Sequence, residues 1–258
     1  MESKMRYMLL FVFIAILRFE DATGQLSLDP SDLLDVCIDS VNHKTKPGPE
    51  GDLYKQCSPW KNRSCCVHET TRNAHLTNLY GFEYDHCGAV KNMSKDCRRH
   101  FLQDLCFYEC SPNIGPWVVK VSDMKIRKER YFQVPLCLSD CKAWFYACSG
   151  DYTCTDNWTR NFIWKDGQNT CPEGAKCRTF LEVFETAENF CRKVWDESWE
   201  PVPDEEPCMR LWFDGEKGNP NERVAQYHAY KIAAMGSGGD TIHPTISLLL
   251  LLTFLLTS

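Results

Sequence analysis

The chain has 258 residues, a formal net charge of −6 and 16 cysteines, all of which lie between Cys37 and Cys208. This modest negative charge, together with the lack of a long basic block in the sequence, argues against a nucleic-acid partner. The even cysteine number is typical of a secreted, disulfide-bonded protein, and the CC and CxxxC spacings disfavour a zinc site, which more often shows paired CxxC motifs. No Pro/Gly/Ser-rich linker interrupts residues 30–210, so we expect one domain with a core of its own.

The N-terminal segment predicts a secretory signal peptide. Lys4 and Arg6 precede an apolar run, residues 7–17, that is too short to span a bilayer. Small residues follow, up to Gly24. Because this order is that of a cleaved signal, we expect residues 1–24 to be removed.

The domain is expected to open with a helix. Asp29 is a suitable N-cap, and Pro30 fits the first turn. Leu33 and Ile38 would then point inward. A loop rich in lysine, proline and glycine follows at residues 43–54.

Three aromatic residues, Tyr80, Phe82 and Tyr84, alternate with a glycine and a glutamate. In an extended segment these aromatic side chains would share one face, as they would when lining a binding site. Plain packing in the core is the competing interpretation, and the local sequence does not separate the two.

The most informative stretch is a predicted helix over residues 97–110. Asp104 and Tyr108 are four residues apart, so they share one face of this helix among other aromatic side chains. A buried carboxylate is costly unless a partner pairs with it. That partner could be a protein cation, with Arg127 and Arg130 as candidates, or it could be a ligand.

Strands are expected over residues 117–122 and 131–134. The basic run between them, 125–130, indicates a solvated turn when it is judged on sequence alone. Residues 135–148 carry cysteines and Trp144 at helical spacing, and they predict the next helix.

A loop-like segment follows at residues 151–164. It interleaves aromatic and basic side chains: Trp158, Arg160, Phe162 and Trp164. A further helix is expected from Thr186 to about Trp199. Trp195 and Ser198 would lie on or near one face of that helix.

The C-terminal segment predicts a GPI-attachment signal. Small residues begin at Gly236, and a polar spacer and an apolar tail ending near Leu256 follow. This order directs lipid attachment, which we place at Gly236 or Ser237, with 237–258 as the propeptide. The domain between the two signals would be residues 25–236, held at the extracellular face of the plasma membrane. A short C-terminal membrane anchor is the alternative.

The sequence contains no GxSxG, HExxH or phosphate-loop motif. A nucleophilic cysteine is not expected if all 16 cysteines pair, so we predict neither an enzyme nor a bound cofactor. Three sequons in a secreted chain predict N-glycosylation at Asn62, Asn92 and Asn157.

The chain resembles the folate receptor family from about Leu33 to Tyr227. The motifs that carry the resemblance are long and specific: KPGPE from Lys46, HFLQDLCFYECSPNIGPW from His100, RKER from Arg127, YTC from Tyr152 with NW from Asn157, and WFD from Trp212 with GNPN from Gly218. The resemblance implies an α+β fold: a single disulfide-rich globular domain with several helices and short strands around a deep ligand pocket, in which the 16 cysteines form eight disulfides.

The resemblance also implies which cysteines pair. Spacing alone leaves the connectivity open, because 16 cysteines allow a very large number of pairings. The implied pairs are Cys37–Cys65, Cys57–Cys106, Cys66–Cys110, Cys87–Cys177, Cys97–Cys148, Cys137–Cys208, Cys141–Cys191 and Cys154–Cys171.

Folic acid and reduced folates are the ligands that the resemblance implies. The carboxylate of Asp104 would accept from the amino group and the adjacent ring nitrogen of the pterin. Arg127 and Arg130 would donate to the acceptor side of the pterin. Arg160 would meet a carboxylate of the ligand, and Ser198 would add a polar contact. Flat rings favour aromatic walls, and the implied walls are Tyr80, Phe82, Tyr108, Trp158, Trp164 and Trp195.

The chain departs from the family pattern mainly toward the pocket mouth. Ile126 replaces a tryptophan, and residues 159–162, TRNF, replace a His-Lys-Gly-Trp run. Trp199 replaces a tyrosine and so loses a hydroxyl. A glycan on Asn157 would crowd the entrance. We therefore expect folate binding with altered affinity or altered preference among folates.

The function implied by the resemblance is that of a cell-surface receptor that binds folates and carries them into the cell by endocytosis. Protonation of Asp104 in an acidic compartment would aid release. The alternative is gamete adhesion, as in the egg-surface sperm receptor Juno, a family member in which this acid is replaced and folate binding is lost. The partner would then be a protein ligand on another cell. A soluble riboflavin carrier is disfavoured by the lipid-anchor signal.

Overall fold

The computed structural model describes residues 29–122 and 127–237. The expected signal peptide, 1–24, lies outside these residues, and so do Ile126 and the expected propeptide apart from its first residue. The described residues fall into two units, of which Pro30–Tyr230 holds the predicted ligand residues.

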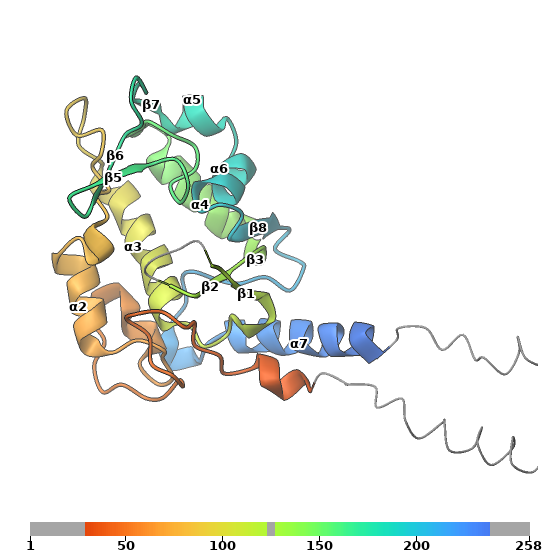
Figure 1. The fold of residues 1–258 in the computed structure, drawn as a ribbon. Helices are drawn as coiled ribbons and strands as arrows, with labels where there is room; N and C mark the ends of the chain where they lie inside the picture. The colour runs from red at the N-terminus through yellow and green to blue at the C-terminus, as the bar shows by residue number, and fades with distance from the viewer. Residues whose placement is uncertain (1–28, 123–126, 238–258) are drawn as a thin grey trace, which may run out of the picture. The chain divides into compact units, whose positions relative to one another are not determined.

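The fold is α+β, as the family resemblance implies (Figure 1). The α-helices are α2 (His68–Leu76), α3 (Lys95–Cys110), α4 (Leu138–Cys148), α5 (Phe180–Phe184), α6 (Ala187–Val194) and α7 (Asn221–Ser237). Short 3-10 turns are η1 (Pro30–Leu33), η2 (Lys55–Trp60), η3 (Leu79–Gly81), η4 (Gly115–Trp117) and η5 (Gly215–Lys217). Among the helices of the described residues, none combines the length and the apolar character that crossing a bilayer requires.

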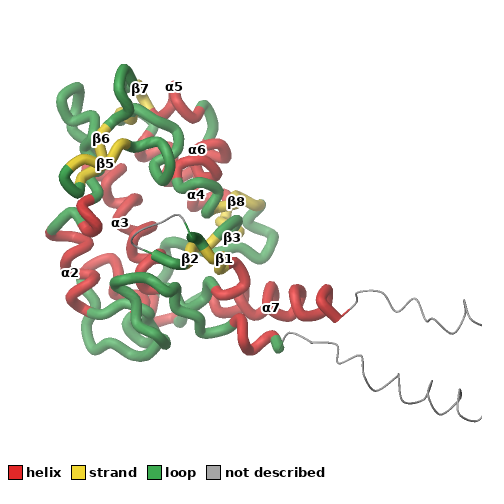
Figure 2. The backbone as a smooth tube through the Cα atoms, in the orientation of Figure 1, coloured by secondary structure: helices red, strands yellow, loops and turns green. Residues whose placement is uncertain are grey.

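The strands are short and are scattered between long loops, as the yellow and green segments of Figure 2 show. They are β1 (Val118–Lys120), β2 (Glu129–Tyr131), β3 (Val134–Cys137), β4 (Tyr152–Thr153), β5 (Ile163–Lys165), β6 (Gln168–Thr170), β7 (Arg178–Thr179) and β8 (Trp199–Val202). They pair two by two: β1 with β2, β4 with β7 and β5 with β6 are antiparallel, and β3 with β8 is parallel. β1 falls within the predicted strand 117–122, whereas the predicted strand 131–134 spans a break at Gln133, whose φ is +54°.

α3 carries the central residues of the predicted site. Ser94 caps it, because the Ser94 side chain accepts the backbone N–H of Cys97 at 3.2 Å. The predicted helix over 97–110 is confirmed, and it begins two residues earlier than expected. Its buried face includes Phe101 and Asp104. α3 packs beside α2 and α4, and α4 packs beside α6 (Figure 1).

Eight disulfides tie the described part of the chain and use all of its cysteines. They join the same pairs that the family resemblance implies. Three of them fix α3: Cys57–Cys106, Cys66–Cys110 and Cys97–Cys148. Because these three anchor both ends of the helix, covalent bonds as well as packing set the position of Asp104.

The first expected helix is wrong in length, since only the 3-10 turn η1 forms. Asp35 has a φ of +59°, which a right-handed helix cannot continue through. The backbone N–H of Val36 then bonds to the carbonyl of Pro112 at 3.2 Å. The chain therefore leaves the turn in an extended form beside the end of α3.

The aromatic segment around Phe82 does not form a strand. Tyr80 and Gly81 have φ values of +61° and +71°, so the chain turns within η3. A side chain at Gly81 would collide with the carbonyl oxygen of Gly167, which requires glycine at this position. Phe82 and Tyr84 are nevertheless both part of the buried core.

The predicted helix over 135–148 begins later, at Leu138. The residues before it form β3, whose register with β8 places Val134 opposite Trp199. Every residue of β3 is buried, so its apolar run reflects a fully buried strand, which periodicity alone does not separate from a helix.

The predicted helix from Thr186 to Trp199 ends early. Thr186 is its N-cap, because its side chain accepts a backbone N–H of the first turn, but α6 stops at Val194. Asp196 and Glu197 have φ values of +54° and +60°, which an α-helix does not accommodate. Trp199 therefore belongs to β8, and it faces α3 from there.

Aromatic rings fill the core between α3, α4 and α6. Phe101 of α3 stacks on Trp158, with ring centroids 4.5 Å apart, and meets Trp144 of α4 at 5.0 Å. Trp144 in turn contacts Phe190 of α6 at 5.0 Å. All four side chains are at most 1% exposed. Because buried rings of this size dominate core energetics, α3 is held in a rigid setting.

Candidate functional site

Asp104 is 4% exposed and lies on the buried face of α3. Its Oδ1 accepts the indole N–H of Trp199 at 2.9 Å. Burial raises the pKa of this carboxyl to about 7, while the N–H groups of Trp199 and Trp195 act in the opposite direction. No lysine, arginine or histidine among residues 29–122 and 127–237 forms an ion pair with it. Within the described residues, therefore, Asp104 has no protein cation as its ion-pair partner.

Two tyrosines that were not among the predicted ligand residues, Tyr84 and Tyr131, lie beside Asp104. Burial raises the pKa of both hydroxyls, and the charge of Asp104 raises them further. The ring of Tyr131 lies 5.3 Å from that of Trp199 and 5.8 Å from that of Tyr108. Packing between distant segments brings Tyr131 here, and no local sequence signal identifies it, whereas Tyr84 belongs to the alternating aromatic run noted in the sequence.

Phe82 brings several predicted wall residues into one cluster. Its ring centroid lies 5.5 Å from Trp195 and 5.7 Å from Trp158. Trp158 is 1% exposed and donates its N–H to Thr153 at 3.0 Å, so it is a buried member of the cluster. Trp164 of β5, 6.4 Å from Phe82, is 48% exposed and lies at the surface.

Tyr108 and Arg127, both predicted ligand residues, contact each other. Arg127 Nη1 donates to the Tyr108 hydroxyl at 3.3 Å, and the guanidinium carbon lies 5.7 Å from the ring centroid. His43 packs edge-on against the same ring at 5.4 Å. Its Nε2 lies 3.0 Å from the Tyr108 carbonyl oxygen, and because a carbonyl only accepts, the imidazole proton is placed on Nε2.

A second buried acid, Glu109, was missed by the sequence prediction. It is 1% exposed and accepts the hydroxyl of Tyr80 at 2.7 Å. Burial raises its pKa to about 8, against the effects of Tyr80 and Arg127, which lower it. Its Oε2 lies 3.7 Å from Nδ1 of His43, whose pKa burial lowers. Glu109 thus positions Tyr80. The available signal was a second acid beside Tyr108 in the same cysteine-flanked turn of the helix.

Two predicted ligand arginines converge on Asp196. Oδ2 of Asp196 accepts from Nη1 of Arg130 at 2.6 Å and from Nε of Arg160 at 2.8 Å. Arg130, which is 5% exposed, also donates through Nη2 to the backbone carbonyl of Asp196. Burial alone would raise the pKa of Asp196, but donors from Arg160, Asn157 and Arg130 outweigh it and lower the pKa. The sequence prediction did not include Asp196.

Two other residues that the sequence analysis named, Trp199 and Ser198, make hydrogen bonds within the protein. Trp199 supplies an N–H to Asp104, so the tyrosine hydroxyl missing from this position is replaced by another donor. The hydroxyl of Ser198 donates to the backbone carbonyl of Trp195 at 2.7 Å, and Ser198 is 7% exposed. Ser198 therefore fixes the turn that presents Trp195.

The predicted glycosylation sites differ in their surroundings. Asn62 and Asn92 are exposed. Asn157 is half-buried, and its Oδ1 accepts the backbone N–H groups of Thr159 and Arg160 at 3.1 Å and 3.0 Å. Its Nδ2 donates to Asp196 at 2.9 Å, so this side chain is part of the arginine cluster.

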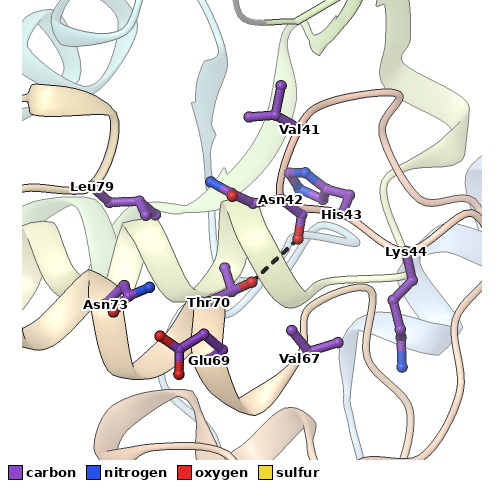
Figure 3. Close-up of a pocket in the computed structure, with 9 residues that line it drawn as sticks. All are labelled: Val41, Asn42, His43, Lys44, Val67, Glu69, Thr70, Asn73 and Leu79. Atoms are coloured by element: carbon purple, nitrogen blue, oxygen red, sulfur yellow. Dashed lines mark hydrogen bonds between the residues drawn. The ribbon is translucent and has the colours of Figure 1, made fainter. Parts of the chain in front are cut away.

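A cavity of about 270 Å³ lies between α2 and residues 41–44, and it contains none of the predicted ligand residues (Figure 3). Its lining residues are Val41, Asn42, His43, Lys44, Val67, Glu69, Thr70, Asn73 and Leu79. Thr70 donates to the carbonyl of Asn42 at 3.3 Å, and Lys44 pairs with Glu50 at 2.7 Å. The cavity is therefore distinct from the cluster around Asp104.

Three groups of histidine and cysteine side chains in the described residues bring their ligand atoms close together. They are Cys57, His75 and Cys106; His86, Cys87 and Cys154; and Cys87, Cys171 and Cys177. Every cysteine in these groups is in a disulfide, and a disulfide offers no thiolate to a metal. We assign no metal to them.

Comparison with known proteins connects these residues to a family. A sequence model described as "Folate receptor family" matches residues 36–210. Human "Folate receptor gamma" is 44% identical over 216 residues, which cover 82% of this chain and 85% of that protein. Human "Folate receptor alpha" is 39% identical over 262 aligned positions, with 99% of this chain and 100% of that protein covered. The "Riboflavin-binding protein" of Gallus gallus is 29% identical over 182 residues, 68% of this chain and 71% of that protein.

Proposed function

The chain belongs to the folate receptor family, and on that premise we propose that it is a receptor that binds folic acid and reduced folates around Asp104. Uptake of the bound folate by endocytosis completes the proposed role. The order of small residues, spacer and apolar tail at the C-terminus supports a GPI anchor at the extracellular face of the plasma membrane.

The observation that carries the proposal is the surroundings of Asp104. This carboxyl is 4% exposed, and among the described residues it accepts a hydrogen bond from the neutral indole N–H of Trp199. A carboxylate has about four lone-pair sites, so this indole leaves acceptor capacity for a ligand. The amino group and the neighbouring N–H of a pterin form a pair of parallel donors that matches the two oxygens.

The aromatic cluster supports the same ligand. Phe82, Trp195 and Tyr108 come from three separate segments, and each lies near Asp104 or near one of its neighbours. A flat pterin and an aminobenzoyl ring pack well against such rings. The proposed donors for the acceptor edge of the pterin are Arg127 and Arg130, so the charge pattern would suit a ring with one donor edge and one acceptor edge.

The adhesion alternative receives no specific support. Asp104 is retained and buried among aromatic rings, as ligand anchoring requires. A protein ligand on another cell remains a sequence-based prediction only.

Direct titration tests the proposed function. The secreted domain, purified with its disulfides intact, is titrated with folic acid near neutral pH while its tryptophan fluorescence is followed. Because Trp195 and Trp164 lie in the proposed walls, we expect saturable quenching at micromolar ligand or below. Riboflavin serves as the control ligand and should quench only weakly. Quenching by riboflavin alone, or no saturable quenching by folic acid, would contradict the proposal.

A further inference from the structure

The three predicted glycosylation sites share one sequence motif, but their side chains have different surroundings. Asn62 and Asn92 are exposed, and within residues 29–122 and 127–237 neither of their side-chain amides forms a hydrogen bond. Asn157 is half-buried, and its side-chain amide forms three hydrogen bonds. The motif alone therefore does not separate an amide that is open to modification from one that is already in use.

Both ends of the Asn157 amide are engaged. Oδ1 accepts the backbone N–H groups of Thr159 and Arg160 at 3.1 Å and 3.0 Å, which closes a turn of the kind that asparagine side chains favour. Nδ2 donates to Oδ1 of Asp196 at 2.9 Å. The oxygen thus shapes the loop over residues 157–160, and the nitrogen joins this loop to the turn that follows α6.

A second contact joins the same two segments. The backbone N–H of Trp158 donates to the carbonyl of Val194, the last residue of α6, at 2.9 Å. The Trp158 side chain is 1% exposed and stacks on Phe101 of α3, with ring centroids 4.5 Å apart. Asn157 therefore lies where the loop meets the core, directly before a buried ring.

N-glycosylation changes the atom of Asn157 that makes this connection. In that reaction Nδ2 attacks the anomeric carbon of a lipid-diphosphate sugar, a C–N bond forms, the lipid diphosphate leaves, and one of the two amide hydrogens is lost as a proton. Nδ2 of Asn157 lies 2.9 Å from the Asp196 carboxylate, whose other oxygen accepts from Arg130, a side chain that is 5% exposed. A sugar ring attached there would have to displace Asp196 or turn the amide away from the loop backbone, and either change breaks hydrogen bonds of the folded domain.

We propose that, in the folded protein, Asn62 and Asn92 carry the N-glycans and Asn157 carries none, because its amide serves as a structural link between the loop and the end of α6. This assignment changes the sequence-based prediction at Asn157 alone. Chains are glycosylated in the secretory pathway before they complete folding, so a chain modified at Asn157 would fail to form these contacts and would not join the folded population. The proposed glycan pattern does not depend on folate binding, so it can hold even where the proposed function fails.

The occupancy of the three sites tests this pattern directly. The full chain is expressed in animal cells, and the folded, disulfide-bonded protein is purified and digested. An amidase that releases N-glycans is applied in heavy-oxygen water, which converts each glycosylated asparagine to an aspartate that contains heavy oxygen. We expect this label at Asn62 and Asn92 and an unmodified asparagine at position 157. The label at position 157, or its absence from either exposed site, would overturn the proposal.

Two alanine substitutions separate the sequon from the structural link. Thr159→Ala and Asn157→Ala both destroy the sequon, but the Thr159 side chain makes no hydrogen bond in the described part of the chain, so only Asn157→Ala removes a bonded side chain. Thr159→Ala should leave the glycan content and the thermal midpoint as in wild type. Asn157→Ala should keep the glycan content but lower the midpoint by about 4 °C or more, because three hydrogen bonds are lost.

Asn62→Ala is the matched control, since it destroys a sequon whose amide makes no hydrogen bond within the described residues. We expect it to remove one glycan and, once all glycans have been released enzymatically, to leave the midpoint near that of wild type. Failure of Asn157→Ala to fold while Thr159→Ala folds would support the structural link. Equal midpoints for Thr159→Ala and Asn157→Ala, or the loss of a glycan in either variant, would contradict it.

Discussion

Trp199 donates its indole N–H to Oδ1 of Asp104 at 2.9 Å, although the two residues are 95 positions apart in the chain. The contact depends on β8, which pairs with β3 and carries Trp199 to the buried face of α3. The hydrogen-bond donor to Asp104 is thus a neutral indole, whereas the sequence offered Arg127 and Arg130 as cationic partners. It stabilises the carboxylate only in part, and the pKa of Asp104 remains raised to about 7 by burial.

Replacing Trp199 with phenylalanine should weaken folate binding by shifting the titration of Asp104. The indole N–H favours the charged form, so Trp199→Phe raises the pKa of Asp104 further. The pH midpoint of folic acid binding should move upward, with a loss of about threefold to tenfold near neutral pH. Binding curves measured across pH check this. Trp212→Phe, which removes an indole that packs on His100, should leave the midpoint in place.

Stability should depend on pH through two buried acids. The pKa of Asp104 is raised to about 7 and that of Glu109 to about 8, from ordinary values of 3.8 and 4.5. Between the ordinary and raised values, the unfolded chain has released protons that the folded domain still binds, so stability contributed by these groups falls as pH rises. Each pK unit amounts to about 1.4 kcal/mol.

The difference in the free energy of unfolding between a variant and wild type isolates the contribution of these two carboxyls. His86 and His100 have pKa values lowered to about 4 by burial, and their effect has the opposite sign, since it raises stability with pH. The double variant Asp104→Asn/Glu109→Gln should therefore gain stability relative to wild type by a few kcal/mol between about pH 5 and about pH 8 in the absence of folate. Thermal unfolding measures the gain. A constant difference across this range would show that the two acids are not buried as described.

Glu109 should matter for binding through the hydroxyl of Tyr80. Glu109→Ala removes the acceptor of a 2.7 Å hydrogen bond and should weaken folic acid binding by about tenfold. Glu109→Gln keeps an acceptor at this place and should stay within about threefold of wild type. Fluorescence titration compares the two variants. If they bind equally well, the position of Tyr80 does not depend on Glu109.

The disulfides of α3 should contribute more to stability than a disulfide that closes a short loop. Cys57 and Cys106 are separated by 49 residues, and replacing both with alanine should cost about 4 kcal/mol in the free energy of unfolding. The matched pair Cys154 and Cys171, separated by 17 residues, should cost about 3 kcal/mol. Denaturant unfolding measures both. Folate affinity should fall more for the first pair, because Cys106 lies on α3 beside Asp104.

The sequence predicts features whose cause is local. The helix over 97–110 follows from its apolar spacing, whereas its first two residues and its cap, Ser94, were not predicted. Asp104 could be singled out because an acid in such a helix is costly without a partner. The family resemblance added the cysteine pairing, which spacing alone leaves open.

Features that depend on distant segments could not be predicted. β3 pairs with β8 and is buried on both faces, so its residues form an uninterrupted apolar run. Such a run lacks the alternation typical of a strand, and the sequence analysis therefore assigned it to a helix. The role of Asp196 depends on two consecutive residues with positive φ and on arginines from two other segments. The sequence analysis treated Trp199 as the loss of a tyrosine hydroxyl. Only the position of Trp199 in β8 shows that its indole N–H donates to Asp104.

The affinity of Asp104→Asn for folic acid tests the central claim most directly. The substitution keeps the size of the side chain but replaces one acceptor oxygen with a donor, so the paired donors of the pterin lose their match. Measured near neutral pH, affinity should fall by at least about 100-fold, since hydrogen bonds to a charged group contribute about 1.5–3 kcal/mol each. Glu109→Gln, which removes the other buried acid of α3, should remain within about threefold. Unchanged affinity in Asp104→Asn, or an equal loss in both variants, would contradict the assignment of Asp104 as the pterin anchor.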